Sequence, residues 1–444
     1  MQYDAAEMPA TTSGRQANRQ QDYLPRVVDR ELDELLAALP AVVLEGARGV
    51  GKTTSAERRA ATVHRLDIPA QLVVAQADPE RLVAGVTPIL IDEWQRLPES
   101  WDLVRRAVDA DRTPGRFLLT GSATPGNAPI HSGAGRIVTL RLRPMTLAER
   151  GVGTPTVSLA DLLQGGRPPI SGKTTVGLET YVHEMLASGL PGLRGLTGRP
   201  LRAALDGYID RIVEHDFAQM GHAVRNPTAL RAWMTAYAAM VSSTAAYETI
   251  RAAATGGYGE KPSRGAAQPY NDVLQRLWIL EPVPAWMPGK GFISRLGQAP
   301  KHQVADPAIA TRLLKLDADA LLERRPPGTS ALPHSTMLGP LFESLVTLSV
   351  RVYAQAAECS VMHLRTRAPN EREVDLIVQR PDGRVLAIEV KLARAIGDDD
   401  VRHLLWLRER IGSDLLDMIV VTTGPEAYRR KDDVAVVPLA LLGA

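Results

Sequence analysis

The sequence is poor in cysteine, in lysine and in net charge. Cys359 is the single cysteine of 444 residues, which excludes an internal disulfide and a zinc site built from cysteines. Lysine accounts for eight of the 52 basic residues, so 44 are arginine. The 52 basic residues stand against 50 acidic ones, for a formal charge of +2. This balance is typical neither of a generally basic nucleic-acid coat protein nor of a polyanionic tail protein.

Long apolar runs and aromatic residues are also scarce. No stretch approaches the roughly 18 apolar residues needed to cross a membrane, and Asp4 and Glu7 stand where a signal peptide would have its apolar core. We therefore expect a soluble, cytoplasmic protein without a membrane partner. Aromatic residues make up 5% of the chain, so a stacking platform for single-stranded nucleic acid is not evident.

The residues that are present fit a globular protein of more than one domain. Hydrophobic residues make up 45% and charged residues 23% of the chain, which are ordinary values. A length of 444 residues predicts two or three domains of about 100–200 residues each. Residues 1–22 are polar and lack periodicity, so we expect a disordered tail there.

An α/β pattern follows the tail. Apolar residues at helical spacing predict a helix over residues 29–39. Short apolar runs predict strands at residues 41–45, 71–75, 88–92, 116–120 and 137–142. Strands that alternate with helices indicate a doubly wound parallel sheet, and the predicted domain spans residues 23–165.

The middle of the chain, residues 166–330, is helical by pattern. Residues 151–175 are rich in glycine, proline and serine and are interpreted as a loop or insertion, whereas residues 176–256 are rich in alanine and helical. A helix at 271–277, followed by short strands around a glycine-rich turn at 288–291, resembles a winged helix-turn-helix. The same pattern fits any small α+β connector.

A second α/β pattern begins after a predicted linker at residues 326–330. It consists of a helix from 338 to about 357, strands around 361, 374 and 385, a helix over 400–411, and strands at 418 and 434. The predicted domain spans residues 331–444. The fold class is therefore α/β at both ends of the chain, with a helical, winged-helix-like region between.

Residues 46–53, Gly-Ala-Arg-Gly-Val-Gly-Lys-Thr, fit the phosphate-binding pattern GxxxxGK[ST]. The motif follows an apolar strand and precedes a helix-forming run, as a phosphate-binding loop (P-loop) should. Backbone N–H groups of such a loop cradle phosphates, and we predict that Lys52 reaches the β- and γ-phosphates while the Thr53 hydroxyl holds Mg²⁺. The predicted ATP-binding residues are Gly46, Ala47, Arg48, Gly49, Val50, Gly51, Lys52, Thr53 and Thr54.

A second acidic strand completes the predicted ATP site. Residues 89–93, Ile-Leu-Ile-Asp-Glu, end in two acids. Asp92 would contact Mg²⁺, and Glu93 would orient or deprotonate the attacking water, which makes the site hydrolytic. Thr120 and Ser122 end the next strand and are candidates for sensing the γ-phosphate, although a simple turn fits them as well.

Hydrolysis in such enzymes is often completed by an arginine from a neighbouring subunit. Arg136, which precedes a predicted strand, is the candidate for this role. The role requires a homo-oligomer, and an ordinary surface arginine is the alternative.

The last hundred residues contain a second set of chemically suited side chains. Glu343 lies in an apolar helix, Asp375 near the start of one strand, and Glu389 and Lys391 at the end of the next, two residues apart and on one face. Three carboxylates suit Mg²⁺ or Mn²⁺, and a metal with a lysine can hydrolyse phosphodiesters. The arrangement resembles that of PD-(D/E)xK nucleases; the alternative is surface salt bridges on an ordinary α/β domain.

The whole chain resembles the prokaryotic AAA-superfamily ATPases that carry a C-terminal nuclease-like domain. The P-loop departs from their usual Gly-Pro-Arg-Gln-x-Gly-Lys-Thr-Thr at Ala47 and Gly49. Further matching segments lie at residues 23–26, 91–98, 119–122, 134–136, 208–216, 301–307, 342–343, 373–375 and 389–391. The resemblance covers about residues 23–440 and implies ATP binding and hydrolysis, a winged-helix-like middle region and a PD-(D/E)xK-like end domain. It implies no settled substrate.

Two functions are compatible with these residues. The first is an ATPase that uses Mg²⁺ and couples hydrolysis to binding, remodelling or metal-dependent cleavage of DNA, with a second Mg²⁺ or Mn²⁺ in the end domain and phosphate contacts from Arg264, Arg276 and Arg295. The alternative is a regulatory or assembly ATPase whose end domain is a non-catalytic binding module. A third, weaker possibility is an ATPase that remodels protein or a small molecule.

Overall fold

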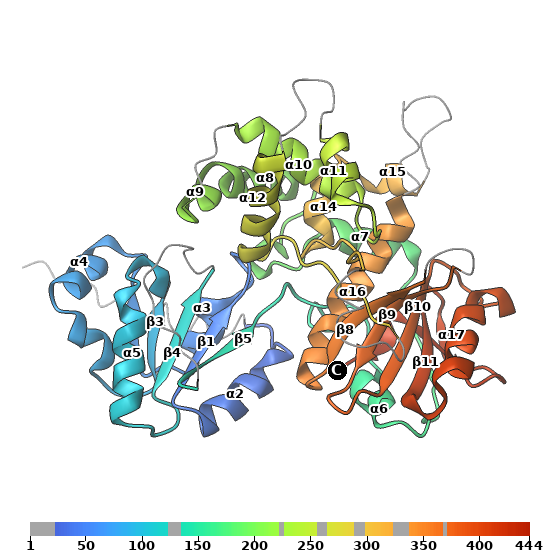
Figure 1. Ribbon diagram of the computed structural model, residues 1–444, viewed down its shortest axis with the longest axis horizontal. Helices are drawn as coiled ribbons and strands as arrows, with labels where there is room; N and C mark the ends of the chain where they lie inside the picture. The colour runs from blue at the N-terminus through green and yellow to red at the C-terminus, as the bar shows by residue number, and fades with distance from the viewer. Residues whose placement is uncertain are drawn as a thin grey trace, which may run out of the picture.

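The computed structural model describes residues 23–122, 135–221, 226–254, 264–287, 298–322, 337–366 and 371–444. The expected tail at 1–22, the glycine-rich turn at 288–291 and the linker at 326–330 lie outside these residues. Figure 1 shows three parts: an N-terminal α/β part (blue to cyan), a helical middle part (green to yellow) and a C-terminal α/β part (orange to red).

The N-terminal part contains a parallel sheet of five strands in the order β2-β3-β4-β1-β5. Its strands are β1 (Ala41–Glu45), β2 (Thr62–Arg65), β3 (Ile89–Asp92), β4 (Phe117–Gly121) and β5 (Ile137–Arg141). β1 lies between β4 and β5. The P-loop therefore leaves the sheet between two other strands, where neighbouring strand ends can supply side chains.

Helices cover both faces of this sheet. Alternate residues of β1 point to opposite faces: Val42 and Leu44 pack in one cluster with α2 and α3, and Ala41 and Val43 pack in another with α4 and α5. The helical elements are α2 (Val28–Ala38), α3 (Lys52–Glu57), α4 (Pro69–Ala77), η1 (Pro79–Val83), η2 (Trp94–Arg96) and α5 (Glu99–Ala110). The predicted doubly wound parallel sheet is confirmed.

The strand predicted at residues 71–75 is wrong. These residues lie within α4, which begins with Pro69 at its first turn, and the side chains of Val73 and Val74 are exposed. The strand that the prediction missed, β2, has the sequence Thr-Val-His-Arg and lies at the sheet edge, half-buried. A short polar edge strand carries little of the apolar signal on which strand prediction depends.

The middle part is helical, as predicted for residues 176–256. Its elements are α7 (Leu178–Leu186), η3 (Pro191–Leu193), α8 (Gly198–Arg211), η4 (Ile212–Asp216, a π-helical turn), α9 (Phe217–Gln219), α10 (Pro227–Ala239), α11 (Tyr247–Ala253), α12 (Arg264–Arg276), α14 (Pro307–Leu313) and α15 (Ala318–Leu321). Beyond α12, Leu280 pairs with Val304 and Val283 with Lys301 as isolated antiparallel bridges. The winged-helix-like character of this region stays a prediction.

The C-terminal part is built on a mixed sheet in the order β7-β12-β13-β11-β10-β9-β8. Its strands are β8 (Ser360–Arg365), β9 (Glu373–Gln379), β10 (Val385–Lys391), β11 (Leu415–Thr422), β12 (Glu426–Arg429) and β13 (Ala435–Pro438), with η6 (Gly412–Asp414) and η7 (Leu439–Leu441) in connections. Helix α16 (Leu338–Ala356) packs with one face and α17 (Asp398–Ile411) with the other. The α/β pattern predicted from residue 338 is confirmed, while a nuclease-like fold stays a prediction. Cys359, half-buried just before β8, packs against the core.

Residues 151–175 differ from the loop that we expected. They contain β6 (Val157–Ser158), α6 (Leu159–Gln164) and β7 (Gly172–Lys173). β7 pairs with β12, β6 pairs with β14 (Leu442–Gly443), and α6 packs against β10 and β11. The segment thus adds to the C-terminal part, although about 185 residues (from 175 to 360) separate it from β8 in the sequence. Single-segment patterns cannot indicate such distant pairing.

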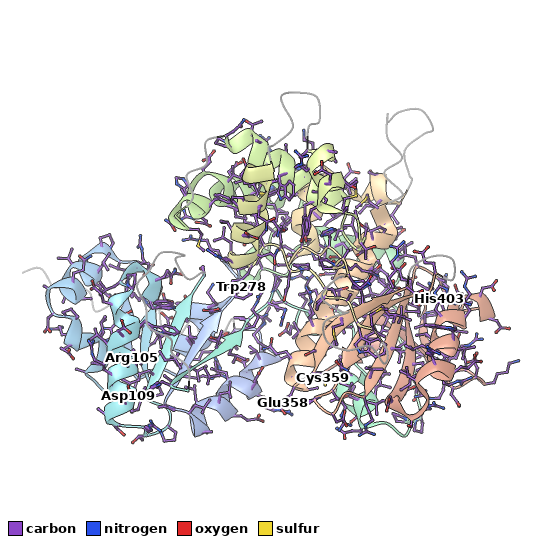
Figure 2. The ribbon with its side chains drawn as sticks, viewed as in Figure 1. Arg105, Asp109, Trp278, Glu358, Cys359 and His403 are labelled. Carbon is purple, nitrogen blue, oxygen red and sulfur yellow. The ribbon has the colours of Figure 1, made fainter. Side chains whose placement is uncertain are left out.

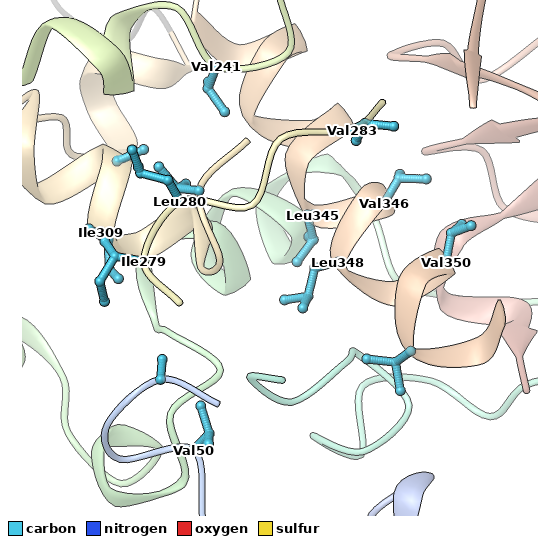
Figure 3. Close-up of a cluster of buried hydrophobic side chains, with 14 of the residues drawn as sticks. Val50, Val241, Ile279, Leu280, Val283, Ile309, Leu345, Val346, Leu348 and Val350 are labelled. Atoms are coloured by element: carbon cyan, nitrogen blue, oxygen red, sulfur yellow. The ribbon is translucent and has the colours of Figure 1, made fainter. Parts of the chain in front are cut away.

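A continuous apolar core and an ion cluster join the three parts. The apolar core includes Val50 of the P-loop, Ile279 after α12, and Leu345 of α16 (Figure 3). In the ion cluster, Glu281 pairs with Arg143 at 2.7 Å, Arg141 at 3.3 Å and Arg351 at 3.5 Å. The Arg141 guanidinium also lies 3.4 Å from the ring centroid of Trp278, which Figure 2 shows between the parts. Among the described residues, no helix is long and apolar enough to cross a membrane.

The ion cluster predicts a large loss of stability on Glu281→Gln. Burial would raise the pKa of Glu281, but the three arginines hold it well below the usual range. Because removal of one partner leaves buried charges uncompensated, we expect the free energy of unfolding to fall by about 3–5 kcal/mol. Chemical denaturation at neutral pH measures this change. The difference from wild type should shrink in acid, as the pH falls through the lowered pKa of Glu281.

Glu358→Gln is the matched control, because Glu358 lies exposed just after α16 (Figure 2). Its effect should stay within about 0.5 kcal/mol. Equal stability of the two variants would contradict a structural role for the cluster.

Candidate functional sites

The P-loop follows β1 directly and depends on three glycines. Gly46, Gly49 and Gly51 have φ angles of 156°, 79° and 101°, a region that L-residues with a side chain rarely adopt. A Cβ atom on Gly46 would lie 2.1 Å from the carbonyl oxygen of Leu142. The backbone is therefore held in a turn that only glycine permits, and turns of this kind can present backbone N–H groups to an anion.

Lys52 lies at the start of α3 and is 5% exposed. Its Nζ donates to the carbonyl oxygens of Gly46 at 2.9 Å and Ala47 at 3.0 Å and to Ser122 Oγ at 3.2 Å. Burial lowers the pKa of Lys52 to about 8, against the opposing effect of Glu93 and Asp92. An ammonium that is desolvated but lacks a direct carboxylate partner is well suited to bind phosphate.

Asp92, at the end of β3, lies beside the threonine predicted to hold Mg²⁺. Thr53 Oγ1 donates to Asp92 Oδ1 at 2.7 Å, and the Thr120 hydroxyl donates to the same oxygen. Burial raises the pKa of Asp92, and these two hydroxyls oppose the rise. A hydroxyl and a carboxylate in contact are oxygen ligands of the kind that Mg²⁺ prefers, so Thr53 and Asp92 fit the ion that the motif implies.

Glu93 occupies a left-handed backbone conformation with φ of 55°. Its N–H donates to Thr120 Oγ1 at 3.4 Å, and its Oε2 accepts from Gln95 Nε2 at 2.5 Å. Residues outside glycine seldom adopt this conformation, and such strain concentrates at functional sites. The contact with Gln95 was not predicted, although Gln95 belongs to a segment of the family resemblance. It fixes the orientation of the candidate catalytic carboxylate.

Arg26 supports the P-loop from behind, a role that the sequence did not reveal. Its Nη1 donates to the Val50 carbonyl at 2.8 Å, its Nη2 to the Arg143 carbonyl at 2.6 Å, and its Nε pairs with Glu149 at 3.0 Å. Both Arg26 and Glu149 have buried side chains. The segment at 23–26, which carried part of the family resemblance, therefore contributes directly to P-loop geometry.

A pocket lies between the P-loop and the middle part. Arg48, Glu93 and Ser122 line it from one side, and Tyr208, Asp216 and Met220 from the other. Arg48 Nη1 pairs with Asp216 Oδ1 at 3.1 Å, and the Tyr208 hydroxyl donates to the Arg48 carbonyl at 3.1 Å. The P-loop thus contacts the π-helical turn η4 through the side chain of Arg48 and helix α8 through its carbonyl oxygen.

Arg136 lies at the other end of the sheet from the P-loop. It precedes β5, whose first residue pairs in register with Ala41, the first residue of β1. The P-loop follows the last residue of β1, so the length of this strand, roughly 15 Å, separates Arg136 from the P-loop. Arg136 Nε donates to Asp109 Oδ1 at 2.8 Å, and Asp109 lies at the outer edge of the N-terminal part (Figure 2). A role for Arg136 in the P-loop of a neighbouring subunit stays a prediction.

The four residues of the nuclease-like pattern lie together in the C-terminal part, with two partners that were not predicted. Lys391 Nζ donates to Glu389 Oε2 at 3.0 Å, and the Val390 N–H donates to Asp375 Oδ2 at 2.9 Å. Lys301 of the middle part inserts its Nζ at 2.9 Å from Glu343, 3.0 Å from Asp375 and 3.1 Å from Glu373. We call Glu343, Glu373, Asp375 and Glu389 the carboxylate cluster.

The charges of the carboxylate cluster are strongly coupled. Burial and the nearby Asp375 raise the pKa of Glu343 to about 8, against the effect of Lys301. Burial and Asp375 likewise raise the pKa of Glu389, against Lys391. Burial would raise the pKa of Asp375 as well, but Lys301 holds it below the usual range.

A metal centre at these carboxylates stays a prediction. Within the described part of the chain, no group of three or more His, Cys, Asp or Glu side chains is arranged to hold a metal ion. The physical reason is that the Lys301 ammonium lies between Glu343 and Asp375, where we expected the cation. The scarcity of lysine was a signal for Lys301, which also lies in one of the segments of the family resemblance.

Similarity to known families is found in each of the three parts. Residues 39–150 match the family model of an AAA domain. Residues 178–320 match a domain of unknown function (DUF8612), and residues 338–442 match another (DUF4143). The AAA match covers the P-loop and the parallel sheet, and it supports ATP binding and hydrolysis by the chain.

Relatives span most of the chain. An uncharacterized protein of Mycobacterium tuberculosis and one of Mycobacterium bovis are each 27% identical to it over 419 residues, which cover 92% of this chain and 82% of each relative. Among solved structures, the Walker-type ATPase of Pyrococcus abyssi aligns with a TM-score of 0.41 and 16% identity, over 67% of this chain and 97% of that one.

The glycine at the start of the P-loop generates a prediction. Gly46→Ala should weaken binding of a fluorescent ATP analogue with Mg²⁺ by at least about tenfold, which corresponds to about 1.4 kcal/mol, because the new Cβ atom displaces the loop. Gly207→Ala is the control, since Gly207 lies in α8 with open space around it. The control should bind the analogue as wild type does. Equal binding by both variants would show that the loop geometry at Gly46 is not required.

Proposed function

We propose that the chain hydrolyses ATP with Mg²⁺ at the P-loop and that the bound nucleotide controls the contact between the P-loop and the middle part. The observation that carries this proposal is the arrangement around Asp92: Thr53 and Thr120 contact one of its oxygens, and Glu93 follows it into the pocket. The proposed metal ligand Asp92, the candidate γ-phosphate sensor Thr120 and the candidate base Glu93 therefore lie at the ends of adjacent strands.

Each side chain has a distinct role in the proposed hydrolysis. The P-loop N–H groups and Lys52 bind and neutralise the β- and γ-phosphates, and Thr53 and Asp92 hold Mg²⁺. When bound, Mg²⁺ supplies charge neutralisation between the two phosphates. Glu93 orients a water molecule toward the γ-phosphorus and accepts its proton, while Gln95 fixes the carboxylate.

The pocket gives the nucleotide a route to the middle part. Arg48 is a P-loop residue, and its side chain is bound to Asp216 of η4. A phosphate in the loop attracts the same guanidinium, so it competes with Asp216 for Arg48. This competition supports a nucleotide-dependent contact between the two parts, and π-helical turns such as η4 are frequent at functional positions.

Of the two functions considered for the C-terminal part, we favour the regulatory or assembly ATPase with a non-catalytic binding module. Lys301 is already bound to Glu343, Asp375 and Glu373, which speaks against a metal-dependent nuclease. DNA as a partner is a weaker hypothesis: Arg276 lies in the last turn of α12, while Arg295 and the side chain of Arg264 fall outside the described residues. Assembly into a homo-oligomer remains part of the proposal through Arg136.

Glu93→Gln tests the hydrolytic step. The amide cannot accept the proton of the attacking water, so we expect phosphate release to fall about 10²–10⁴-fold with ATP affinity nearly unchanged. Chelation of Mg²⁺ by EDTA should abolish turnover of the wild type. Phosphate release and binding of a fluorescent ATP analogue are measured side by side.

The control is Glu99→Gln, an exposed acid at the start of α5, which should hydrolyse ATP at the wild-type rate. Full turnover by Glu93→Gln would remove this residue from the mechanism. Full turnover by Lys52→Ala would refute hydrolysis at the P-loop altogether.

A plasmid assay distinguishes a non-catalytic binding module from a metal-dependent nuclease in the C-terminal part. Supercoiled plasmid is incubated with Mg²⁺ or Mn²⁺ and either the wild type or Lys391→Ala. Because Lys301 occupies the carboxylate cluster, both proteins should leave the plasmid at the same background level. Metal-dependent nicking by the wild type that disappears in Lys391→Ala would instead support DNA cleavage.

A further inference from the structure

Lys301 makes an unusually complete set of ionic contacts for a buried lysine. Its side chain has no exposed area, and its Nζ lies within 2.9–3.1 Å of oxygens from Glu343, Asp375 and Glu373. A protonated lysine has three N–H donors and no acceptor. The ammonium donates hydrogen bonds to Glu343 and Asp375 and forms an ion pair with Glu373, and such compensation lowers the penalty for burying a charge.

The backbone of Lys301 is also fixed in place. Its N–H donates to the Val283 carbonyl at 2.9 Å and its carbonyl accepts from the Val283 N–H at 2.8 Å. The next residue, His302, exchanges backbone hydrogen bonds with Ser242 and Ser243 at 2.8 Å, and its Nε2 lies 2.7 Å from the Ala245 carbonyl. The middle part therefore holds the Lys301 ammonium against the carboxylate cluster through backbone hydrogen bonds on both sides of the residue.

Glu389 completes the carboxylate cluster, and one of its oxygens can accept a further hydrogen bond or ionic contact. Its Oε2 accepts from Lys391, whereas its Oε1 is buried without a hydrogen-bond donor. His403 Nδ1 lies 3.9 Å from Oε1, beyond hydrogen-bond range, and 2.7 Å from the Glu373 carbonyl oxygen. A buried carboxylate oxygen without a donor indicates a place where a further cation would be favourable.

We propose that the Lys301 ammonium is the resident cation of the carboxylate cluster and that it excludes divalent metal ions from a latent site formed by Glu343, Asp375 and Glu389. Ammonium and metal compete because both need the same oxygens of Glu343 and Asp375. Mg²⁺ binds oxygen at about 2.1 Å in a nearly octahedral shell, which the ammonium at 2.9–3.0 Å from those two residues leaves no room to form. Removal of the ammonium frees an oxygen-rich, buried site for Mg²⁺ or Mn²⁺.

The inference does not rest on ATP hydrolysis, and its test uses full-length protein without nucleotide. Binding of Mn²⁺ is followed by the loss of the electron paramagnetic resonance signal of the free ion. Wild type should show no stoichiometric binding, whereas Lys301→Met should bind about one Mn²⁺ per chain. Addition of Asp375→Asn to Lys301→Met should abolish that binding, which distinguishes the cluster from the P-loop.

Two further variants keep the test decisive. Lys431→Met removes an exposed lysine of the C-terminal part and should behave as wild type. The double variant Lys301→Met/Glu373→Gln removes one charge of each sign, so it should fold even if Lys301→Met alone does not. It retains all three side chains of the proposed metal site. If neither variant folds without metal, refolding in Mn²⁺ should recover protein with bound ion.

Three outcomes would overturn the proposal. The first is stoichiometric Mn²⁺ binding by the wild type that Asp375→Asn removes, because the metal would then displace the ammonium. The second is a folded Lys301 variant that binds no Mn²⁺. The third is failure of both variants to refold in Mn²⁺, which would make Lys301 a purely structural cation with no latent metal site behind it.

Discussion

The buried ammonium of Lys301 is the interaction on which the chemistry of the C-terminal part depends. Four carboxyl groups from α16, β9 and β10 converge there, and a cation among them offsets the cost of burying their negative charge. Lysine from the middle part supplies that cation, with contacts of 2.9–3.1 Å to three of the carboxylates. The same contacts hold a segment of the middle part against the C-terminal sheet. Charge neutralisation and attachment of two parts of the chain are therefore one interaction.

Lys52 presents the opposite case within the same molecule. It is buried as well, but its partners are carbonyl and hydroxyl oxygens, and burial lowers its pKa to about 8. Burial would lower the pKa of Lys301 too, but Asp375, Glu343 and Glu373 raise it above the usual lysine range. An ammonium without a direct carboxylate partner gains most from an incoming phosphate, whereas one with three gains nothing. The partners of the two lysines thus distinguish a ligand-binding site from a filled one. Other ion pairs join the parts: Arg48 and Asp216 connect the P-loop to the middle part, and Glu281 binds arginines of the other two parts.

The sequence predicted the elements and side chains that depend on local pattern. The strands that carry the P-loop and Asp92, the helix of Glu343 and the strands of Asp375 and Glu389 were all placed from hydrophobic periodicity and motif spacing. What it missed depends on distant pairing: the contribution of α6 and β7 to the C-terminal part, the support of Val50 by Arg26, and the insertion of Lys301. The metal centre was predicted from the three acids alone and stays a prediction, whereas the ammonium that contacts two of those acids comes from a residue 42 positions before Glu343. Spacing within a motif carries no information about a charge that arrives from elsewhere in the chain.

Two proposed sites are central here: the P-loop binds a divalent metal together with the nucleotide, and the carboxylate cluster is filled by the Lys301 ammonium instead of a metal. Crystals grown with MnCl₂ and a non-hydrolysable ATP analogue test this assignment most directly, through the anomalous scattering of manganese. We expect a peak at Thr53 and Asp92, with no peak between Glu343 and Asp375. A manganese peak bound to Asp375 and Glu389, with Lys301 displaced from the carboxylate cluster, would contradict it.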